Sequence, residues 1–424
     1  MMSATSKFLI IGLALLVSIA LPPFLSAGWQ NALNTMLIAS LFALSFNLLA
    51  GQAGLLSFGH AAYFGVGAFA ALHLMLAVED GLPVPTPLLP LAGALAGLVA
   101  GVVSGWFSTM RSGVYFALVT LAIAELFHSL TPHLQGLFGG ESGISSMRMP
   151  WMGIRFATIL EVYYLTLGWF VICAVLLWAY TRTPFGRLTL ALRDNEQRVR
   201  FMGYDAHVSK TLIFTVSAMF SGVAGALQAV TNETANYDLF SAGVSSQVVL
   251  FTYVGGATLF FGPVFGAVAF TVFAFLMSDL TRSWLFYQGL IFVLVMLYAP
   301  HGIGGALAMQ LRQWRELDWR RLVKPYATAT VGGLMIAAGV VFLTETVSIL
   351  FGLDYEHART LTPDYLPDFT LMGQVWSPVA VSTWVLPAVL LIGGIALLQV
   401  ARRWLDHSDD AMAASDTETS KGSV

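Results

Sequence analysis

Hydrophobic residues in this chain form long, nearly unbroken runs, and polar residues gather in short blocks between them. A helix needs about 20 mostly apolar residues to cross a bilayer, so each long run predicts a transmembrane helix. A shorter run over 247–254 lies between glycines and is open to two interpretations, a further span or a re-entrant segment. The long runs cover residues 8–26, 32–50, 61–78, 88–108, 114–130, 162–180, 211–230, 264–277, 284–299, 329–350 and 379–400.

The positions of the basic residues orient these spans. Lys and Arg accumulate in the cytoplasmic segments of membrane proteins, and here they cluster at 182–210, 312–324 and 402–403. All three clusters fall on one side of the membrane if 247–254 is counted as a crossing. The sequence therefore predicts an all-α polytopic membrane protein with about ten core transmembrane helices, a polar cytoplasmic helix and two extra C-terminal transmembrane helices.

The same patterns predict how the chain is divided. We expect a main transmembrane domain, a charged cytoplasmic linker that carries tryptophan, an accessory transmembrane pair joined by an outer loop, and a small, polar, disordered cytoplasmic tail. The respective bounds are 1–310 (with the polar segment at 181–210), 311–328, 329–400 (with the loop at 351–377) and 401–424.

Composition narrows the function. The chain is 57% hydrophobic and only 10% charged, with a mean hydropathy of +0.76, so lipid must cover much of its surface. Its single cysteine, Cys173, excludes a disulfide framework, and no basic domain suggests nucleic acid as a partner. None of its lysines lies in a G-x-x-x-x-G-K-[ST] motif. If ATP drives this protein, a separate chain must hydrolyse it.

The block "GRLTLALRDNEQRVRFMGYDAHVSK", 186–210, is unusually polar for this chain. As a helix it would carry an apolar stripe, acid-first pairs that join Asp194 to Arg198 and Glu196 to Arg200, and a C-terminal stop at Gly203. This pattern suits docking in a groove of a soluble partner. It equally suits a helix that lies on the membrane surface. The stripe consists of Leu188, Leu192, Val199 and Met202.

The block also resembles the cytoplasmic coupling segment of branched-chain amino acid ABC importer permeases, the LivM-like family, whose relatives carry urea and amides. Other stretches resemble the same family in the same order: "NLLAGQAGLLSFGHAAYFGVGAF", "SGVYFALVTLAIAE" followed by "FGGESGI", "YVGGATLFFGPVFGA" and "APHGIGGAL". The resemblance covers about residues 8–310 and does not extend to the C-terminal pair.

The resemblance implies an importer in the bacterial inner membrane. Such a permease pairs with a second one, usually as a heterodimer, on two ATPase subunits that hold ATP and Mg. A periplasmic or extracellular binding protein delivers the substrate, and the permease itself binds no cofactor and is not an enzyme. In this sequence the family's coupling contacts fall on Arg187, Arg193, Asp194, Asn195 and Glu196, and Gly203 ends the helix.

Polar residues deep in the spans are candidates for the substrate pathway because they are costly in lipid. Two stretches interrupted by glycine, 47–60 and 253–267, repeat a Phe-Gly pair, and matched interruptions often mark a transporter's binding site. His60 would line the pathway or, alternatively, satisfy backbone carbonyls in a cytoplasmic turn. The pathway candidates are Asn47, Gln52, Ser57, His60, Glu125 and Thr258, together with Tyr115 and Thr120, which the family resemblance alone places on the path.

Two further features of the core bear on function. Glu125 and His128 lie one turn apart, as a proton relay or half of a metal site would require, although a pair that satisfies itself is the simpler interpretation; no further ligand spacing predicts a metal. Small residues at every fourth position predict close helix packing or a surface that slides during gating. They are Gly93, Gly97, Gly101 and Gly105. The outer segment 131–161 could receive a binding protein or fold over the permease as a lid.

Two classes of function remain. The first is an importer subunit for small amino acids of the branched-chain type, with urea, short amides or other small metabolites as alternative substrates. The second is an ion-coupled secondary transporter that uses Glu125 and His128. No arginine lies inside a predicted span, which favours a neutral or zwitterionic substrate.

Overall fold

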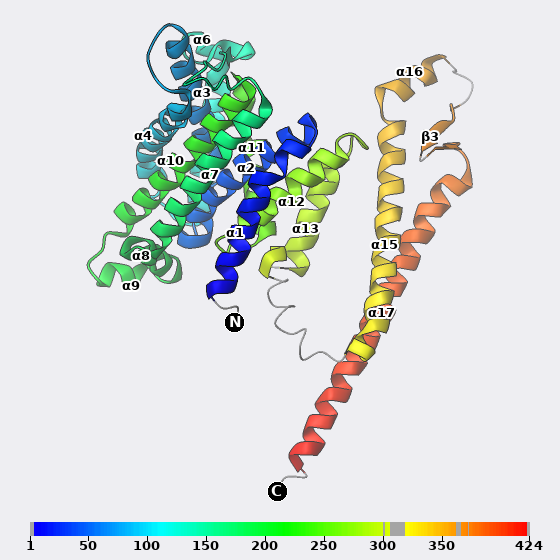
Figure 1. The fold of residues 1–424 in the computed structure, drawn as a ribbon. Helices are drawn as coiled ribbons and strands as arrows, with labels where there is room; N and C mark the ends of the chain where they lie inside the picture. The colour runs from blue at the N-terminus through cyan, green and yellow to red at the C-terminus, as the bar shows by residue number, and fades with distance from the viewer. Residues whose placement is uncertain (1–3, 300–301, 306–318, 362–365, 372, 422–424) are drawn as a thin grey trace. The chain divides into compact units, whose positions relative to one another are not determined.

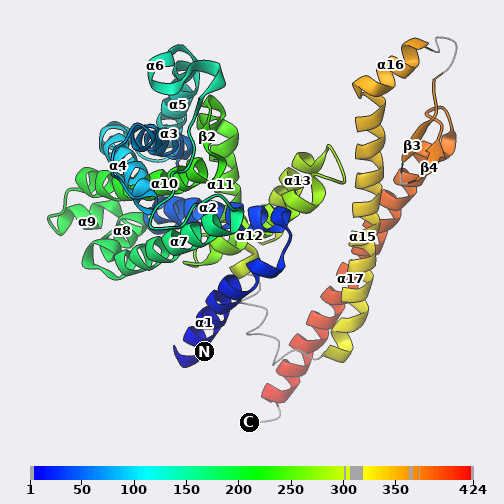
Figure 2. The ribbon, with the colours of Figure 1, turned by 45° about the horizontal axis from the view of Figure 1, so that its top comes forward.

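The computed structural model describes residues 4–299, 302–305, 319–361, 366–371 and 373–421. It divides into two units, one formed by Met1–Leu276 with Gln288–Met309 and the other by Met277–Tyr287 with Gln310–Val424. The main helices, shown in Figures 1 and 2, are α1 (Ala4–Ala20), α2 (Ala27–Asn47), α3 (His60–Glu79), α4 (Leu89–Ser108), α5 (Val114–Leu130), α6 (Gln135–Phe138), α7 (Ile159–Arg182), α8 (Pro184–Asp194), α9 (Glu196–Phe201), α10 (Ala206–Asn232), α11 (Ala242–Gly255), α12 (Gly262–Met277), α13 (Trp284–Tyr298), α15 (Trp319–Leu350), α16 (Leu353–Leu361) and α17 (Val381–Lys421).

The prediction of an all-α polytopic membrane protein is confirmed. Within the described residues, eight helices are long and apolar enough to cross a membrane, and four further apolar helices are shorter. The run at 247–254 is part of one of these shorter helices, α11, whose 14 residues extend about 21 Å. The other three short helices are Gly12–Phe24, α12 and α13.

The first unit is organised around α10, which is buried between α2, α3 and α4 along most of its length (Figure 1). The glycines of α4 explain how it comes so close to α10. A Cβ on Gly97 would lie 2.5 Å from the carbonyl oxygen of Ala218, and one on Gly101 would lie 2.6 Å from the Ala218 Cβ. Gly93 meets Gly222 and Ala226 in the same way, and Gly105 meets Phe214. The glycines predicted to pack therefore lie along the contact between these two helices.

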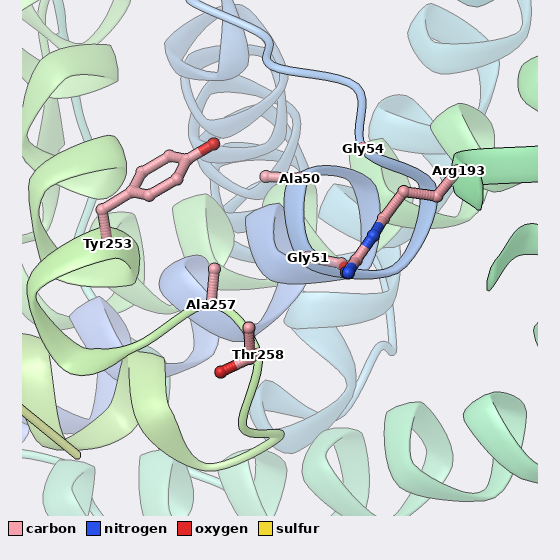
Figure 3. Close-up of a pocket in the computed structure, with 7 residues that line it drawn as sticks. All are labelled: Ala50, Gly51, Gly54, Arg193, Tyr253, Ala257 and Thr258. Carbon is pink, nitrogen blue, oxygen red and sulfur yellow. The ribbon is translucent and has the colours of Figure 1, made fainter. Parts of the chain in front are cut away.

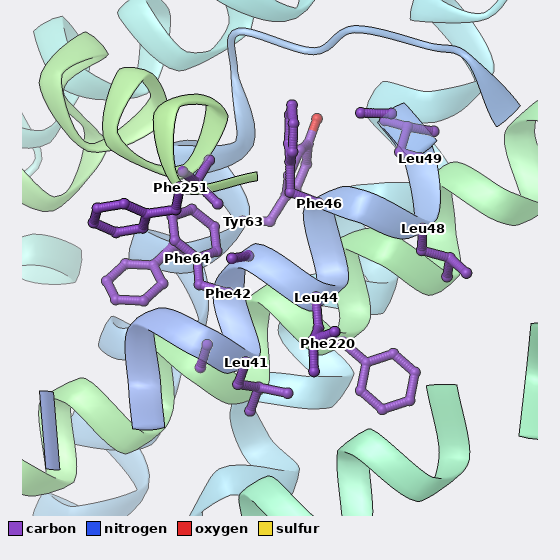
Figure 4. Packing of buried hydrophobic residues seen from close by; sticks show 14 of the residues in the cluster. Leu41, Phe42, Leu44, Phe46, Leu48, Leu49, Tyr63, Phe64, Phe220 and Phe251 are labelled. Carbon is purple, nitrogen blue, oxygen red and sulfur yellow. The ribbon is translucent and has the colours of Figure 1, made fainter. Parts of the chain in front are cut away.

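Large apolar side chains fill the rest of this unit. Figure 4 shows α2 at the centre of the cluster, where its side chains meet those of neighbouring helices. The rings of Phe42 and Phe64 of α3 pack with their centres 4.7 Å apart and their planes tilted by 41°, and Tyr63 meets Phe214 of α10 edge to face at 5.3 Å. Offset and edge-to-face pairs of this kind add specificity to the burial of apolar area. The cluster fixes α2, α3 and α10 as one body.

Two helical interruptions lie in this unit. In the first, residues 48–59, α2 continues into a single π turn, Leu48–Gln52, and then into an extended segment that ends where α3 begins. In the second, residues 256–261, the chain leaves α11 and starts α12. Close glycine contacts hold the second one together: a Cβ on Gly255, Gly262 or Gly266 would clash with backbone atoms across the interruption. Both interruptions depart from the regular α-helical hydrogen-bond pattern, as helices often do at functional sites.

At the opposite end of the unit, the segment between α5 and α7 folds back onto the bundle. Its strand Ile144–Ser145 pairs with Thr234–Ala235, which follows α10. Arg148 donates hydrogen bonds to the carbonyls of Val230 and Thr231 and forms a 3.1 Å ion pair with Glu233. The segment is thus tied to the end of α10, as the lid interpretation expects.

The second unit consists mainly of α15 and α17, which pack side by side as a hairpin through Gly332 and Gly394. Strands Phe369–Leu371 and Gln374–Trp376 form a small hairpin between α16 and α17. The structure differs from expectation at both ends of the pair. Helix α15 begins at Trp319, inside the predicted linker. Helix α17 continues to Lys421 through the predicted disordered tail, because no glycine or proline interrupts the chain between Ile395 and Lys421.

Candidate coupling site and translocation pathway

The polar segment folds into two short helices, not one. Helix α8 ends at Asp194, and the backbone of Asn195 is extended. The side-chain oxygen of Asn195 accepts a hydrogen bond from the backbone N–H of Arg198. Asn195 is therefore the N-cap of α9, and the predicted Asp194–Arg198 pair falls on two different helices. The predicted stop is present: Gly203 has a φ of +87°, and the N–H groups of Gly203 and Tyr204 close a Schellman motif on the carbonyls of Arg200 and Val199.

The apolar stripe of this segment points inward except at Met202. Leu192 and Val199 are buried against Ala206 at the start of α10, and Leu188 packs beside them. The stripe therefore holds α8, α9 and α10 together and does not offer a greasy ridge to a partner. The exposed apolar surface lies instead at the turn after α9, where Phe201 is 91% exposed and Met202 and Tyr204 are more than half exposed. We call these three residues the apolar tip.

Glu196 has both carboxylate oxygens engaged within the chain. One lies 2.6 Å from Arg200, as the predicted i,i+4 pair requires, and the other lies 2.5 Å from Lys210 of α10. Lys210 is buried and also donates to the Ser112 hydroxyl at 2.8 Å. Partial burial raises the pKa of Glu196, but the hydrogen bonds and charges of Lys210 and Arg200 outweigh it, so the pKa lies below its ordinary value. Glu196 thus ties α9 to the transmembrane body.

Arg193 reaches away from α8 into the first interruption. Its Nη1 donates a 2.6 Å hydrogen bond to the carbonyl oxygen of Gly51, and its aliphatic stem lies over Gly54. Beside this contact is a cavity of about 290 Å³ (Figure 3). It brings together both interruptions and the polar segment, because its lining residues are Ala50, Gly51, Gly54, Arg193, Tyr253, Ala257 and Thr258. Of the predicted site residues, Arg193 and Thr258 therefore share one cavity, although the sequence offered no reason to group them.

Arg187 and Asp194, the remaining residues predicted to contact a partner, are exposed on α8. Asn47 and Gln52 flank Gly51: Asn47 ends α2, and Gln52 ends the π turn. A side-chain oxygen of each is buried without a hydrogen-bond partner, which is costly and makes the first interruption poorly satisfied in this conformation. These two amides lie at the interruption and not in the middle of a span.

His60 is fully buried at the start of α3, where hydroxyl groups satisfy both ring nitrogens. Nδ1 lies 3.1 Å from the Ser57 hydroxyl and Nε2 lies 2.8 Å from that of Ser217. Ser217 donates its own proton to the Ser45 carbonyl, so Nε2 of His60 is the donor in the contact with Ser217. The histidine joins α2, α3 and α10. Its ring nitrogens are hydrogen-bonded to hydroxyl groups, whereas the alternative interpretation predicted hydrogen bonds to backbone carbonyls.

Helix α5 carries the remaining predicted residues on different faces. Thr120 is buried and accepts a hydrogen bond from the backbone N–H of Phe58, so it supports the first interruption. Tyr115, 71% exposed, and Glu125 lie on the opposite face. Together with other exposed residues at spacings of three and four they form one line along the helix, which we call the α5 stripe. It consists of Tyr115, Leu118, Ala122, Glu125 and Ser129.

Glu125 and His128 do not form an ion pair within the described residues. The His128 ring instead packs against Tyr237 with the ring centres 5.4 Å apart. No group of three or more His, Cys, Asp or Glu side chains in the described part of the chain is arranged to hold a metal ion. The geometry thus leaves Glu125 as an isolated carboxylate on an exposed face of a transmembrane helix.

Comparison with known proteins identifies the family. The family model described as the permease component of the branched-chain amino acid transport system matches residues 29–300. The chain belongs to this permease family. It is 26% identical over 314 residues to the high-affinity branched-chain amino acid transport system permease protein LivM of Escherichia coli strain K12, covering 68% of this chain and 73% of the relative. Identity to LivM of Salmonella typhimurium strain LT2 is 27% over 313 residues, with the same shares.

A shorter similarity links this permease to the L-arabinose transport system permease protein AraH of Escherichia coli, 32% identical over 96 residues, or 23% of this chain and 28% of the relative. No solved structure matches the chain. The resemblance inferred from the sequence motifs is confirmed, and the protein is a multi-pass transport subunit. The family match ends before α15 and α17.

Sequence reasoning missed several residues that build the candidate coupling site. In the sequence Lys210 is one of several clustered positive charges, yet it is the buried partner of Glu196. Tyr253 belongs to a sequence motif that gives no indication of its place in the cavity. Phe201 gave a usable signal, because a bulky aromatic residue directly before Met-Gly in a polar segment is out of place on a solvated surface.

Proposed function

We propose that this chain is the permease subunit of an ABC importer that moves branched-chain amino acids across the bacterial inner membrane. Two separate ATPase subunits would bind ATP and Mg, a second permease subunit would complete the membrane domain, and a periplasmic or extracellular binding protein would deliver the substrate. The names of the LivM relatives and the family match support the substrate class.

The observation that carries this proposal is the apolar tip. Helices α8 and α9 are packed on α10 by their apolar stripe and tied to it by the Glu196–Lys210 pair, so they form a rigid handle. The handle ends in a nearly fully exposed phenylalanine on a side predicted to be cytoplasmic. Exposed aromatic residues of this kind anchor protein interfaces when they enter a pocket on a partner. A cytoplasmic ATPase that closes on ATP would move this handle.

The α5 stripe supports the transport half of the proposal. A carboxylate at mid-span costs about 2.5–3.5 kcal/mol or more if it faces lipid. Glu125 is exposed in the single chain, so the α5 stripe must face protein or water in the working assembly. A second permease subunit packed opposite this stripe would enclose a polar path between the two chains. The path would end near the interruptions.

The contact at the tip can be tested by comparing two phenylalanines. Phe201→Ala should weaken co-purification of the ATPase with the permease at least tenfold, because loss of a central aromatic anchor typically costs more than about 1.4 kcal/mol. Phe351→Ala removes a phenylalanine that is 86% exposed in the second unit and should leave the complex intact. Retention of the ATPase by Phe201→Ala at the wild-type level would contradict the proposal.

A second measurement separates the importer from an ion-coupled transporter. Uptake of labelled leucine into cells should stop when the partner ATPase is inactivated while the proton gradient persists. Uptake that continues, and that depends on Glu125 instead, would establish secondary transport. Uptake of labelled urea or acetamide in place of leucine would retain the ABC mechanism and change the substrate.

A further inference from the structure

We infer that Arg193 transmits movement of the α8–α9 handle to both helical interruptions, an inference that rests on the proposed function. Arg193 would then be a positioning residue that acts inside the permease and not a contact to the ATPase. Four observations support this role: a hydrogen bond, a steric contact, a direct backbone contact between the two interruptions, and the cavity beside them.

The hydrogen bond joins the handle to a weak point in a span. Arg193 is in the last turn of α8, and its guanidinium donates to the carbonyl oxygen of Gly51 at 2.6 Å. Hydrogen bonds from a charged donor are roughly twice as strong as neutral ones. Gly51 belongs to the π turn, where the regular helical pattern is already broken. The handle is therefore hydrogen-bonded to the π turn that follows α2, where the regular helical hydrogen-bond pattern is broken.

The steric contact involves Gly54, whose φ of +68° is a backbone conformation that glycine adopts without strain and other residues rarely adopt. A Cβ at this position would lie 2.7 Å from Cγ of Arg193. The absence of a side chain lets the arginine stem lie directly on the backbone of the first interruption. Any displacement of α8 toward the membrane would push this backbone.

Gly51 passes the movement to the second interruption. A Cβ on Gly51 would clash with the carbonyl oxygen of Ala257, so the two backbones are in direct contact. Thr258 and Tyr253, on either side of Ala257, line the same cavity as Arg193. The cavity of about 290 Å³ leaves room for the two interruptions to rearrange when the arginine moves. Arg193 is the side chain of the handle that lines this cavity.

The nature of the side chain matters here. An arginine keeps its charge in any environment, and its planar fork can hold Gly51 while its stem lies on Gly54. A lysine could reach the same carbonyl only as a single flexible donor. The conservative substitution Arg193→Lys should therefore restore part of the function lost in Arg193→Ala.

The test measures coupling in the affinity-purified importer reconstituted in liposomes. Arg193→Ala should retain the ATPase and hydrolyse ATP within about twofold of wild type, while the number of leucine molecules transported per ATP falls at least tenfold. Arg193→Lys should lie between the two. Arg198→Lys, the same substitution at an exposed position of α9, is the matched control and should not change the ratio.

A second readout does not require the ATPase. The N–H groups of Ala53 and Leu55 both donate hydrogen bonds to the Leu49 carbonyl. In the full-length permease in nanodiscs, Arg193→Ala should raise the rate of amide hydrogen exchange at these two residues at least tenfold. Unchanged exchange together with an unchanged ratio of transport to ATP hydrolysis would overturn the inference. Loss of ATPase binding in Arg193→Ala would also overturn it, because the arginine would then be a docking residue. If no ATPase partner exists, the proposed function fails, while the exchange result still reports on the contact.

Discussion

The contact between α4 and α10 offers a quantitative test of how the membrane domain is held together. In Gly97→Ala the new Cβ would lie 2.5 Å from the Ala218 carbonyl oxygen, whereas ordinary contact begins at about 3.4 Å. The two helices would have to separate by about 0.9 Å, since a backbone carbonyl in a helix cannot rotate aside. Overpacking of this kind typically costs about 1–3 kcal/mol.

A second glycine corrects for helix propensity. Gly168 lies inside α7, and a Cβ added there would have nothing within 4 Å, so Gly168→Ala gains the same propensity, about 1 kcal/mol, without a clash. The difference between the two variants therefore isolates the packing cost of about 1–3 kcal/mol. Unfolding by SDS from dodecyl maltoside micelles, followed by tryptophan fluorescence, measures this difference.

A rescue experiment sharpens the test further. Gly101→Ala would clash with the Cβ of Ala218, at 2.6 Å, whereas Gly97→Ala would clash with the carbonyl oxygen of the same residue. Ala218→Gly should therefore restore stability to Gly101→Ala but not to Gly97→Ala. Equal stability of Gly97→Ala and Gly168→Ala, or equal rescue of both α4 variants, would refute the packing argument.

Three further predictions concern the ends of α10 and are measured by the same unfolding assay. Asp205→Ala should cost about 1 kcal/mol, because the Asp205 carboxylate caps α10 by accepting from the N–H groups of His207 and Val208; Asp205→Asn should lose much less. Glu196→Gln should be less stable than wild type by an amount that is constant from pH 7 to pH 5. Because folding lowers the pKa of Glu196 below its ordinary value of 4.5, the wild-type advantage is present above 4.5 and must shrink as the pH falls below it. A difference in unfolding free energy between wild type and Glu196→Gln that grows as the pH falls below 4.5 would contradict this reasoning. Arg148→Met should cost about 1–3 kcal/mol and expose the segment between α5 and α7 to proteases, since two carbonyls and Glu233 lose a largely buried partner. Unaltered cleavage would show that the pairing of strand Ile144–Ser145 with Thr234–Ala235 suffices.

The positions of the spans could be predicted from the sequence because hydropathy alone determines them. Lipid accepts only apolar surface, so each long apolar run had to become a helix, and the fold class followed. The internal division of the polar segment was predicted less well. Its apolar spacing fits one helix, but Asn195 caps α9 from an extended conformation and splits it. An asparagine three residues before the N–H that it caps is a recognised start signal, so this break was open to prediction.

The candidate site was beyond prediction from local patterns. Arg193 and Gly51 are 142 residues apart, and no periodicity relates them. Glu196 and Arg193 look equivalent in the sequence, as charges on one helix face, yet Glu196 pairs with Arg200 and with Lys210 of α10, whereas Arg193 reaches the Gly51 carbonyl. Which charge contacts a partner depends on the turn that α9 makes, and this turn exists only in the folded chain.

The two ways in which the handle is attached explain where its movement must go. On one side, α9 is fixed to α10 through Glu196 and Lys210, and α10 is in turn locked against α4 by contacts that leave no room even for a methyl group. On the other side, Arg193 contacts the π turn at Gly51, beside a buried Asn47 side-chain oxygen that has no hydrogen-bond partner among the described residues, and it lines a cavity. The two attachments therefore differ in their backbone: through α10 a force on the apolar tip would meet a continuous helix, and through Arg193 it would meet segments where the helical hydrogen-bond pattern is broken. Since a close-packed contact shifts only as a unit, the interruptions are the place where the membrane domain can change shape while α10 stays in position.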